Sequence, residues 1–210
     1  MDRVWRLHPS MTSSGVFERH LAAMPAGTYR LFGDVVHANG FPETITSSVD
    51  TAGLRGTPLI GDDAGGTAPP VAAPVKDRTV ADLDAGWKMV WDRNPGPLTA
   101  RRATLFRFHI ETPDGKRAHD LELYMGMPGH AAFIATGGSV FAHVHPSGSV
   151  AMAALELANP SAHNMMNMAA PTEVVFPYGF PQPGAYRIIV QMKRAGAVQT
   201  GTFDAHVSQP

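Results

Sequence analysis

Three histidines are the residues whose type and spacing point most directly to chemistry: His130, His143 and His145. Imidazole nitrogens bind zinc and copper, and a site of three imidazoles keeps a fourth position for water, substrate or another ligand. His143 and His145 are two residues apart, so in a strand both side chains project from the same face. The sequence therefore predicts a metal site if the fold brings His130 to this pair.

A β-hairpin is the element that would bring the three histidines together. Apolar runs at 131–135 and 140–144 flank Gly137 and Gly138, and such a Gly-Gly pair is a strong hairpin signal. With these glycines as the loop, residue 134 pairs with 141, 132 with 143 and 130 with 145, which puts all three histidines on one face. An odd-length loop or a bulge would move His130 to the other face. The opposite face is wholly apolar, so we expect it to face the core; it carries Ala131, Phe133, Ala135, Val140, Ala142 and Val144.

Methionines supply a second class of candidate ligand. Met125 and Met127 flank Gly126 shortly before His130, and they share a face if that segment is extended. Thioether ligands favour Cu(I), whereas the alternative interpretation of a methionine is core filling. Residues 163–168 hold three more methionines, for which copper capture, a lid and packing over the sandwich edge are all open. We therefore expect copper first and zinc second.

The composition excludes several classes of protein. A formal net charge of −1 gives no basic footprint for nucleic acid. The absence of cysteine excludes disulfides, thiolate metal sites and a cysteine nucleophile. No stretch approaches the ~18 apolar residues of a membrane span, and residues 1–9 lack a signal-peptide core, so we expect any signal or anchor segment to be absent from this chain.

Turn residues and short apolar runs predict an all-β protein. The 21 Gly and 18 Pro favour many short strands over long helices. We expect a partial β-sandwich repeat at 1–52, a Gly/Pro/Ala-rich linker at 53–77 and a complete β-sandwich domain at 78–210. One short helix is predicted in the second unit, between Ser149 and Ala158.

An internal repeat relates the two units. Residues 27–31 (GTYRL) match residues 184–188 (GAYRI), and residues 8–10 match residues 145–147, both of which read HPS. We expect two related immunoglobulin-like or cupredoxin-like units, with Tyr29 and Tyr186 tied to the backbone by their hydroxyls. The first unit has no counterpart of residues 104–141, so it would pack on the second unit, form a homodimer or be completed by residues upstream.

Residues 124–131, 140–148 and 176–187 resemble a family of largely uncharacterised bacterial exported or membrane-anchored proteins. Its pattern is YMGMxGH…HxHPxG followed by FPxxGxYRxxxQ, and residues 7–49 resemble a preceding HLHP…PxGxYR repeat. The resemblance implies β-sandwich modules similar to those of periplasmic copper-handling proteins. It also implies a periplasmic or extracellular location, and it supplies no reaction.

Three functions remain open from the sequence. The first is a copper- or zinc-binding β-sandwich protein of the bacterial cell envelope, with Met125 or Met127 as the auxiliary ligand. The second is a metal-dependent hydrolase of a small ester or lactone, in which Asp120 or Glu122 acts as a base near a metal-bound water. The third is a structural or interaction module whose histidines only cap strands.

Overall fold

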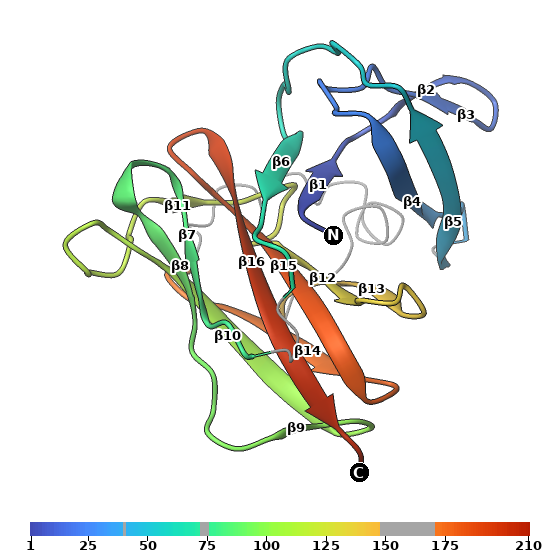
Figure 1. Ribbon diagram of the computed structural model, residues 1–210. Coiled ribbons are helices and arrows are strands. Elements are labelled where there is room, and N and C mark those ends of the chain that lie inside the picture. The colour runs from blue at the N-terminus through green and yellow to red at the C-terminus, as the bar shows by residue number, and fades with distance from the viewer. Residues whose placement is uncertain (40, 72–75, 148–170) are drawn as a thin grey trace. The chain divides into compact units, whose positions relative to one another are not determined.

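The computed structural model of the chain describes residues 1–39, 41–71, 76–147 and 171–210, and their regular secondary structure is almost entirely β-strand (Figure 1). The all-β prediction is therefore confirmed. The only helical element among these residues is a 3-10 turn, η1 (Asp84–Gly86), and the helix predicted between Ser149 and Ala158 lies outside them. Contacts group the described residues into one unit of 1–4, 66–71, 76–147 and 171–210, and another of 5–39 and 41–65.

The first unit consists of two sheets. One has the strand order β13-β12-β15-β16-β9, with β11 paired to β15, and the other has the order β14-β10-β8-β7. All neighbouring strands are antiparallel except β16 and β9. The strands are β7 (Val80–Asp82), β8 (Lys88–Trp91), β9 (Leu98–Thr99), β10 (Ala103–Glu111), β11 (Leu121–Glu122), β12 (His130–Ala135), β13 (Phe141–Val144), β14 (Val174–Gly179), β15 (Gly184–Arg194) and β16 (Ala197–Ser208).

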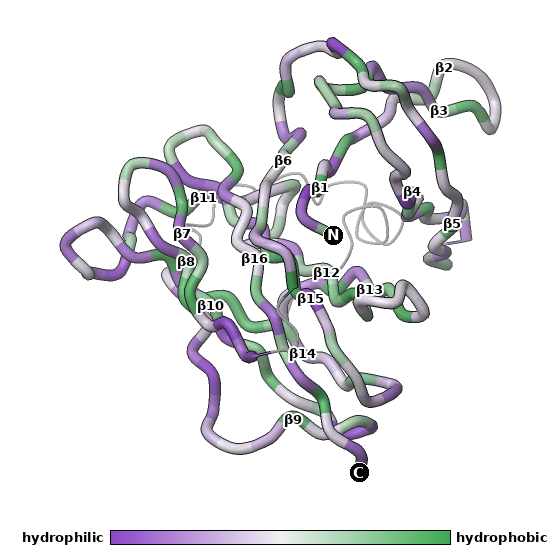
Figure 2. Tube along the Cα trace, viewed as in Figure 1, coloured by the Kyte–Doolittle hydropathy of each residue, from purple (hydrophilic) through white to green (hydrophobic). Residues whose placement is uncertain are grey.

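Aromatic side chains from both sheets form the core between them. Phe106 and Phe108 on β10 are fully buried, and Phe106 contacts Phe133 on β12 edge-to-face at 4.9 Å between ring centroids. Phe108 meets Phe203 on β16 at 5.0 Å. Along β16, hydrophobic residues alternate with hydrophilic ones from Phe203 onward (Figure 2). This period-two pattern gives each strand one core face and one outer face.

Backbone hydrogen bonds link the two sheets at both edges. The amide of Ser147, just beyond β13, donates to the carbonyl of Val175 on β14 at 2.7 Å. At the opposite edge, the amide of Arg78 donates to the carbonyl of Asp204 on β16 at 2.9 Å, just before the chain enters β7. The end of β13 therefore lies at a corner of the sandwich.

The outer face of the larger sheet carries a buried ion pair. The Nε of Arg187, a residue only 1% exposed, donates to the carboxylate of Asp204 at 2.9 Å. Its guanidinium also donates to the carbonyl oxygens of Met1 and Pro69. These bonds attach the segments 1–4 and 66–71 to the unit.

The second unit consists of two-stranded ribbons. β2 (Ser10–Ser13) pairs with β3 (Val16–Glu18), and β4 (Gly27–Val36) pairs with β5 (Pro42–Thr51). A further pair, β1 (Arg3–Arg6) with β6 (Ala64–Thr67), has residues assigned to both units. Among its described residues, the buried apolar side chains are Ala22, Met24 and Ala64. The prediction that this unit is a partial β-sandwich repeat stays a prediction.

The same tyrosine contact occurs in both units. The hydroxyl of Tyr29 donates to the carbonyl of Pro25 at 2.8 Å, and the hydroxyl of Tyr186 donates to the carbonyl of Gln182 at 2.8 Å. In each case the acceptor lies four residues before the tyrosine. The predicted structural role of these tyrosines is confirmed, while the relationship between the units stays a prediction.

Candidate metal centre

The hairpin of β12 and β13 has the predicted register. Ala132 pairs with His143 and Ile134 pairs with Phe141. The closing loop is longer than Gly137 and Gly138 alone, because the amide of Ala135 already donates to the carbonyl of Val140 at 2.9 Å. This four-residue loop has the same centre as the predicted two-residue loop, and both contain an even number of residues. The pairing of the strands is therefore unchanged.

The apolar face of the hairpin packs into the core as predicted. Ala131 and Phe133 are buried there, and Ala142 and Val144 pack against them. Since side chains alternate along each strand, the histidines project from the outer face. His130 is only 3% exposed, whereas His143 and His145 are partly buried.

The three histidine rings converge. One ring nitrogen from each residue lies within 4.8 Å of the others. Ring centroids are 5.2 Å apart for His130 and His143, 5.5 Å for His130 and His145, and 4.8 Å for His143 and His145. A tetrahedral zinc ion with imidazole nitrogens at about 2.0–2.1 Å separates those nitrogens by about 3.3 Å. The observed 3.1 Å between Nδ1 of His130 and Nε2 of His143 is close to that separation.

The main chain orients the His130 ring. Its Nε2 lies 3.1 Å from the carbonyl oxygen of Tyr124, and the Tyr124 ring contacts it edge-on at 5.0 Å. A carbonyl oxygen can only accept, so Nε2 carries the proton and Nδ1 of the neutral ring carries the lone pair. That lone pair faces His143. Metal-binding histidines commonly have such an outer hydrogen bond.

Met125 and Met127 lie in a tight turn, so the premise of an extended segment was wrong. The amide of Tyr124 donates to the carbonyl of Met127 at 2.7 Å, and the amide of Met127 donates back at 3.1 Å. Positive φ angles at Met125 (51°) and Gly126 (76°) are typical of a type I′ turn. Met127 is buried and Met125 is 39% exposed. A role for either thioether as a ligand stays a prediction.

The two candidate carboxylate bases are engaged elsewhere. Arg194 donates two hydrogen bonds to Asp120, at 3.2 and 2.6 Å, and the hydrogen bond from Arg194 lowers the pKa of the Asp120 carboxyl. The carboxylate of Glu122 accepts the amide of Gly196 at 2.7 Å. Both carboxylates therefore bind the end of β15 and the turn to β16. In the part of the chain that the structure describes, the metal-binding group consists of imidazoles alone.

Gly129 and Gln191 support the cluster, and the sequence analysis missed both. A Cβ atom on Gly129 would lie 2.7 Å from the backbone oxygen of Gln191, so only glycine fits where the chain enters β12. Gln191 lies opposite His130 in the ladder between β12 and β15, and it is 4% exposed. Its Nε2 donates to the hydroxyl of Thr200 at 3.2 Å. In the sequence, Gln191 is a polar residue that alternates with apolar ones along its strand, and this pattern could have identified it.

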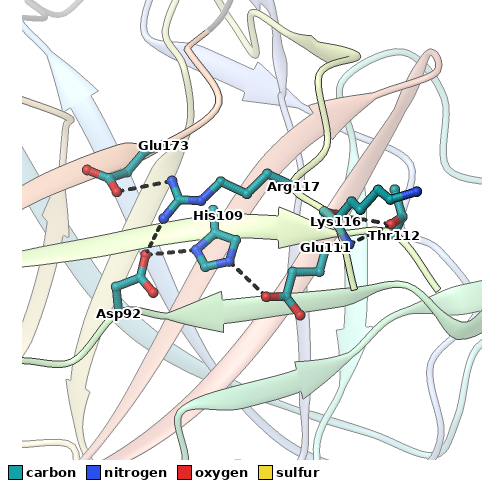
Figure 3. Close-up of polar contacts among 7 residues, drawn as sticks. All are labelled: Asp92, His109, Glu111, Thr112, Lys116, Arg117 and Glu173. Atoms are coloured by element: carbon teal, nitrogen blue, oxygen red, sulfur yellow. Dashed lines mark hydrogen bonds and ion pairs between the residues drawn. The ribbon is translucent and has the colours of Figure 1, made fainter. Parts of the chain in front are cut away.

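A second buried histidine, His109, lies on the outer face of the smaller sheet (Figure 3). Its Nδ1 is 2.8 Å from Asp92 and its Nε2 is 3.1 Å from Glu111. Arg117 joins this network through Asp92 at 3.2 Å and Glu173 at 3.3 Å. Because both ring nitrogens face carboxylates, the ring is held in this polar network. His109 therefore has a structural role in this sheet.

His8, the predicted repeat counterpart of His145, has a carboxylate as its neighbour. Its Nδ1 lies 3.3 Å from Asp63, which also accepts the backbone amide of His8 at 2.9 Å. Arg19 contacts the same carboxylate. Burial lowers the pKa of His8. His8 thus has a carboxylate and a guanidinium nearby, whereas His145 has two imidazoles.

The fold and the cluster define a class: an all-β sandwich protein with a candidate three-histidine metal site. The chain belongs to the family described as Domain of unknown function (DUF8832), whose model matches residues 81–209, more than half of the chain. No curated protein and no solved structure matches the chain. A search of the described residues finds no helix with the length and apolar character needed to cross a membrane.

Proposed function

We propose that this protein binds one copper or zinc ion through His130, His143 and His145. The observation that carries the proposal is the convergence of three imidazole rings whose ligand atoms lie within 4.8 Å of one another. Three imidazoles suit both metals, and they leave a fourth coordination position.

The site is held by a sheet before any metal binds. His130 lies on the central strand β12, which pairs with β13 on one side and β15 on the other. The core face of the same hairpin fixes the side-chain direction. Ligands held in this way lose little conformational freedom when the metal binds. The partial burial of His143 and His145 leaves a route for the ion.

Copper is the first expectation and zinc the second. The resemblance to copper-handling modules supports copper, and so does the exposed thioether of Met125 on the turn that contacts His130 through Tyr124. If a thioether joins the site, Cu(I) binds more tightly than zinc. Competition between Cu(I) and Zn²⁺ for the wild-type protein and a Met125→Ala variant tests this preference.

The cellular setting follows from the same resemblance: a periplasmic or extracellular protein of the bacterial cell envelope. A homodimer is the proposed partner state, supported by apolar side chains exposed on the β4–β5 ribbon at Leu31, Ile45 and Val49. Light scattering over a range of protein concentrations tests the dimer, and a monomer at every concentration contradicts it.

The decisive experiment compares metal content and thermal stability. The wild-type protein should hold a stoichiometric metal ion, and its Tm should rise on metal addition according to RT ln(1 + [L]/Kd). A His143→Ala/His145→Ala variant should lose both properties, whereas a His119→Ala variant, altered at an exposed histidine, should keep them. A wild-type protein without metal and without a shift in Tm refutes the proposal and favours a structural module.

Binding is better supported than hydrolysis. A fourth coordination position beside three imidazoles suits an activated water, as a hydrolase of a small ester or lactone requires. However, Asp120 and Glu122, the predicted bases, are bound to Arg194 and to the amide of Gly196. Metal-dependent turnover that is lost in a His130→Ala variant would establish the hydrolase. No turnover on a panel of esters and lactones would dismiss it.

A further inference from the structure

We propose that His130 and His143 bind the metal through different ring nitrogens, Nδ1 of His130 and Nε2 of His143, and that the turn from Tyr124 to Met127 positions the first of them. This inference rests on the proposed metal binding and states how that site is built.

The His130 ring is held in one tautomer and one orientation. Its Nε2–H donates to the carbonyl of Tyr124 in a position where His130 is 3% exposed and Tyr124 is fully buried. Turning the ring to present Nε2 to a metal would break this hydrogen bond and leave the amide of Met127 as the donor to that carbonyl. Nδ1 is therefore the ligand atom of His130.

The opposite assignment follows for His143. Its Nε2 lies 3.1 Å from Nδ1 of His130, which carries a lone pair. In the metal-free protein, the proton between these two nitrogens therefore lies on Nε2 of His143. Binding through Nε2 moves that proton to Nδ1 of the same ring by exchange with water, so the ring stays neutral. The partial burial of His143 gives water access for this exchange. His130 is thus preformed as a ligand, and His143 changes its tautomer.

The turn that supplies the Tyr124 carbonyl is a compact support. Two backbone hydrogen bonds join Tyr124 and Met127, and Gly126 adopts a φ of 76° that favours glycine. The Tyr124 ring also packs edge-on against His130 at 5.0 Å. The turn therefore fixes both the position of the acceptor and the plane of the ring. Outer-shell partners of this kind typically change metal affinity 10–100-fold when lost.

Long-range ¹H–¹⁵N spectra of the histidine rings test the nitrogen assignments directly. In the metal-free protein we expect protons on Nε2 of both His130 and His143, with resonances assigned from His130→Gln and His143→Gln variants. With Zn²⁺ we expect His130 to keep its Nε2 proton and His143 to carry its proton on Nδ1. A proton on Nδ1 of His130 in either form refutes the inference. If neither Zn²⁺ nor Cu(I) binds, the proposed function fails, while the metal-free spectrum still tests the tautomers.

A matched pair of glycine variants tests the turn. Gly126 and Gly115 have φ values of 76° and 78°, so alanine strains the backbone similarly at both positions. Gly115 lies in the turn between β10 and β11, and a Cβ atom there would meet nothing within 4 Å. We expect Gly126→Ala to weaken Zn²⁺ binding 10–100-fold and Gly115→Ala to change it less than about twofold. Equal affinities in the two variants refute the role of the turn, and the wild-type spectra decide the nitrogen assignment if Gly126→Ala does not fold.

Discussion

Each sheet of the first unit carries one almost fully buried histidine on its outer face, and the two differ in their neighbours. His130 is 3% exposed and His109 is 4% exposed. The nitrogens of His109 face the carboxylates of Asp92 and Glu111. Those of His130 face a backbone carbonyl and another imidazole.

This difference shows that burial alone does not give a histidine its role. Both nitrogens of His109 face carboxylates, so the ring joins an ion network with Arg117. One carbonyl acceptor uses one nitrogen of His130 as a donor and leaves the lone pair on the other directed at His143. The first arrangement stabilises strand packing and the second can bind a metal.

Replacing His130 or His109 by alanine gives the largest expected difference in metal affinity. His130→Ala should weaken Zn²⁺ or copper binding more than about 100-fold, beyond the loss typical of outer-shell partners, because it removes a ligand. His109→Ala should leave the affinity within about twofold of the wild type. Isothermal titration calorimetry on folded protein measures both, and similar losses in the two variants would show that the comparison is wrong.

The network around His109 should contribute to the stability of the metal-free protein. His109→Leu leaves Asp92 and Glu111 facing each other without the shared donor, so we expect a loss of roughly 1–3 kcal/mol in the free energy of unfolding. Urea denaturation of the metal-free protein measures it. The exposed His119→Leu variant should stay within about 0.5 kcal/mol of the wild type. An unchanged unfolding free energy for His109→Leu would remove the structural role assigned to the network.

The entry to β12 offers a test of how closely the metal site depends on packing. Gly129→Ala places a Cβ atom 2.7 Å from the backbone oxygen of Gln191, so the strand must shift and His130 with it. We expect a loss of about 1–3 kcal/mol in stability and weaker metal binding. Gly137→Ala, in the loop of the same hairpin with nothing within 4 Å, is the control. Metal affinity unchanged in Gly129→Ala would mean that the site tolerates displacement of β12.

The smallest expected effect is a loss of stability at alkaline pH that arises from Tyr178 and not from the histidines. Tyr178 on β14 stacks on Phe133 at 4.3 Å, and burial raises its pKa from 10.0 to about 12. Between these values the unfolded chain loses the phenolic proton and the folded chain keeps it, so stability falls as pH rises through this window. Tyr178→Phe should reduce that fall without affecting metal binding. Urea denaturation from pH 9 to 11 measures the slope, and an equal slope in both proteins would contradict the assignment.

The hairpin and its histidine face could be predicted from the residues alone. Alternation with period two places His143 and His145 together, and the centre of an even loop sets the pairing that adds His130. These are local properties of one chain segment, and a longer loop of the same parity did not alter them. The tyrosine hydrogen bonds in the two units were predictable for the same reason.

The surroundings of each histidine were decided by tertiary structure. Asp92, Glu111 and Glu173 meet His109 and Arg117 only because β8, β10 and β14 pair in one register, which no short segment encodes. The acceptor for His130 is the carbonyl of Tyr124, and a backbone carbonyl has no sequence signature. The turn that carries it has a methionine at a positive φ, where a sequence pattern predicts glycine or asparagine. Side-chain type therefore determined which residues were able to bind a metal, and long-range pairing decided which partners their ring nitrogens meet.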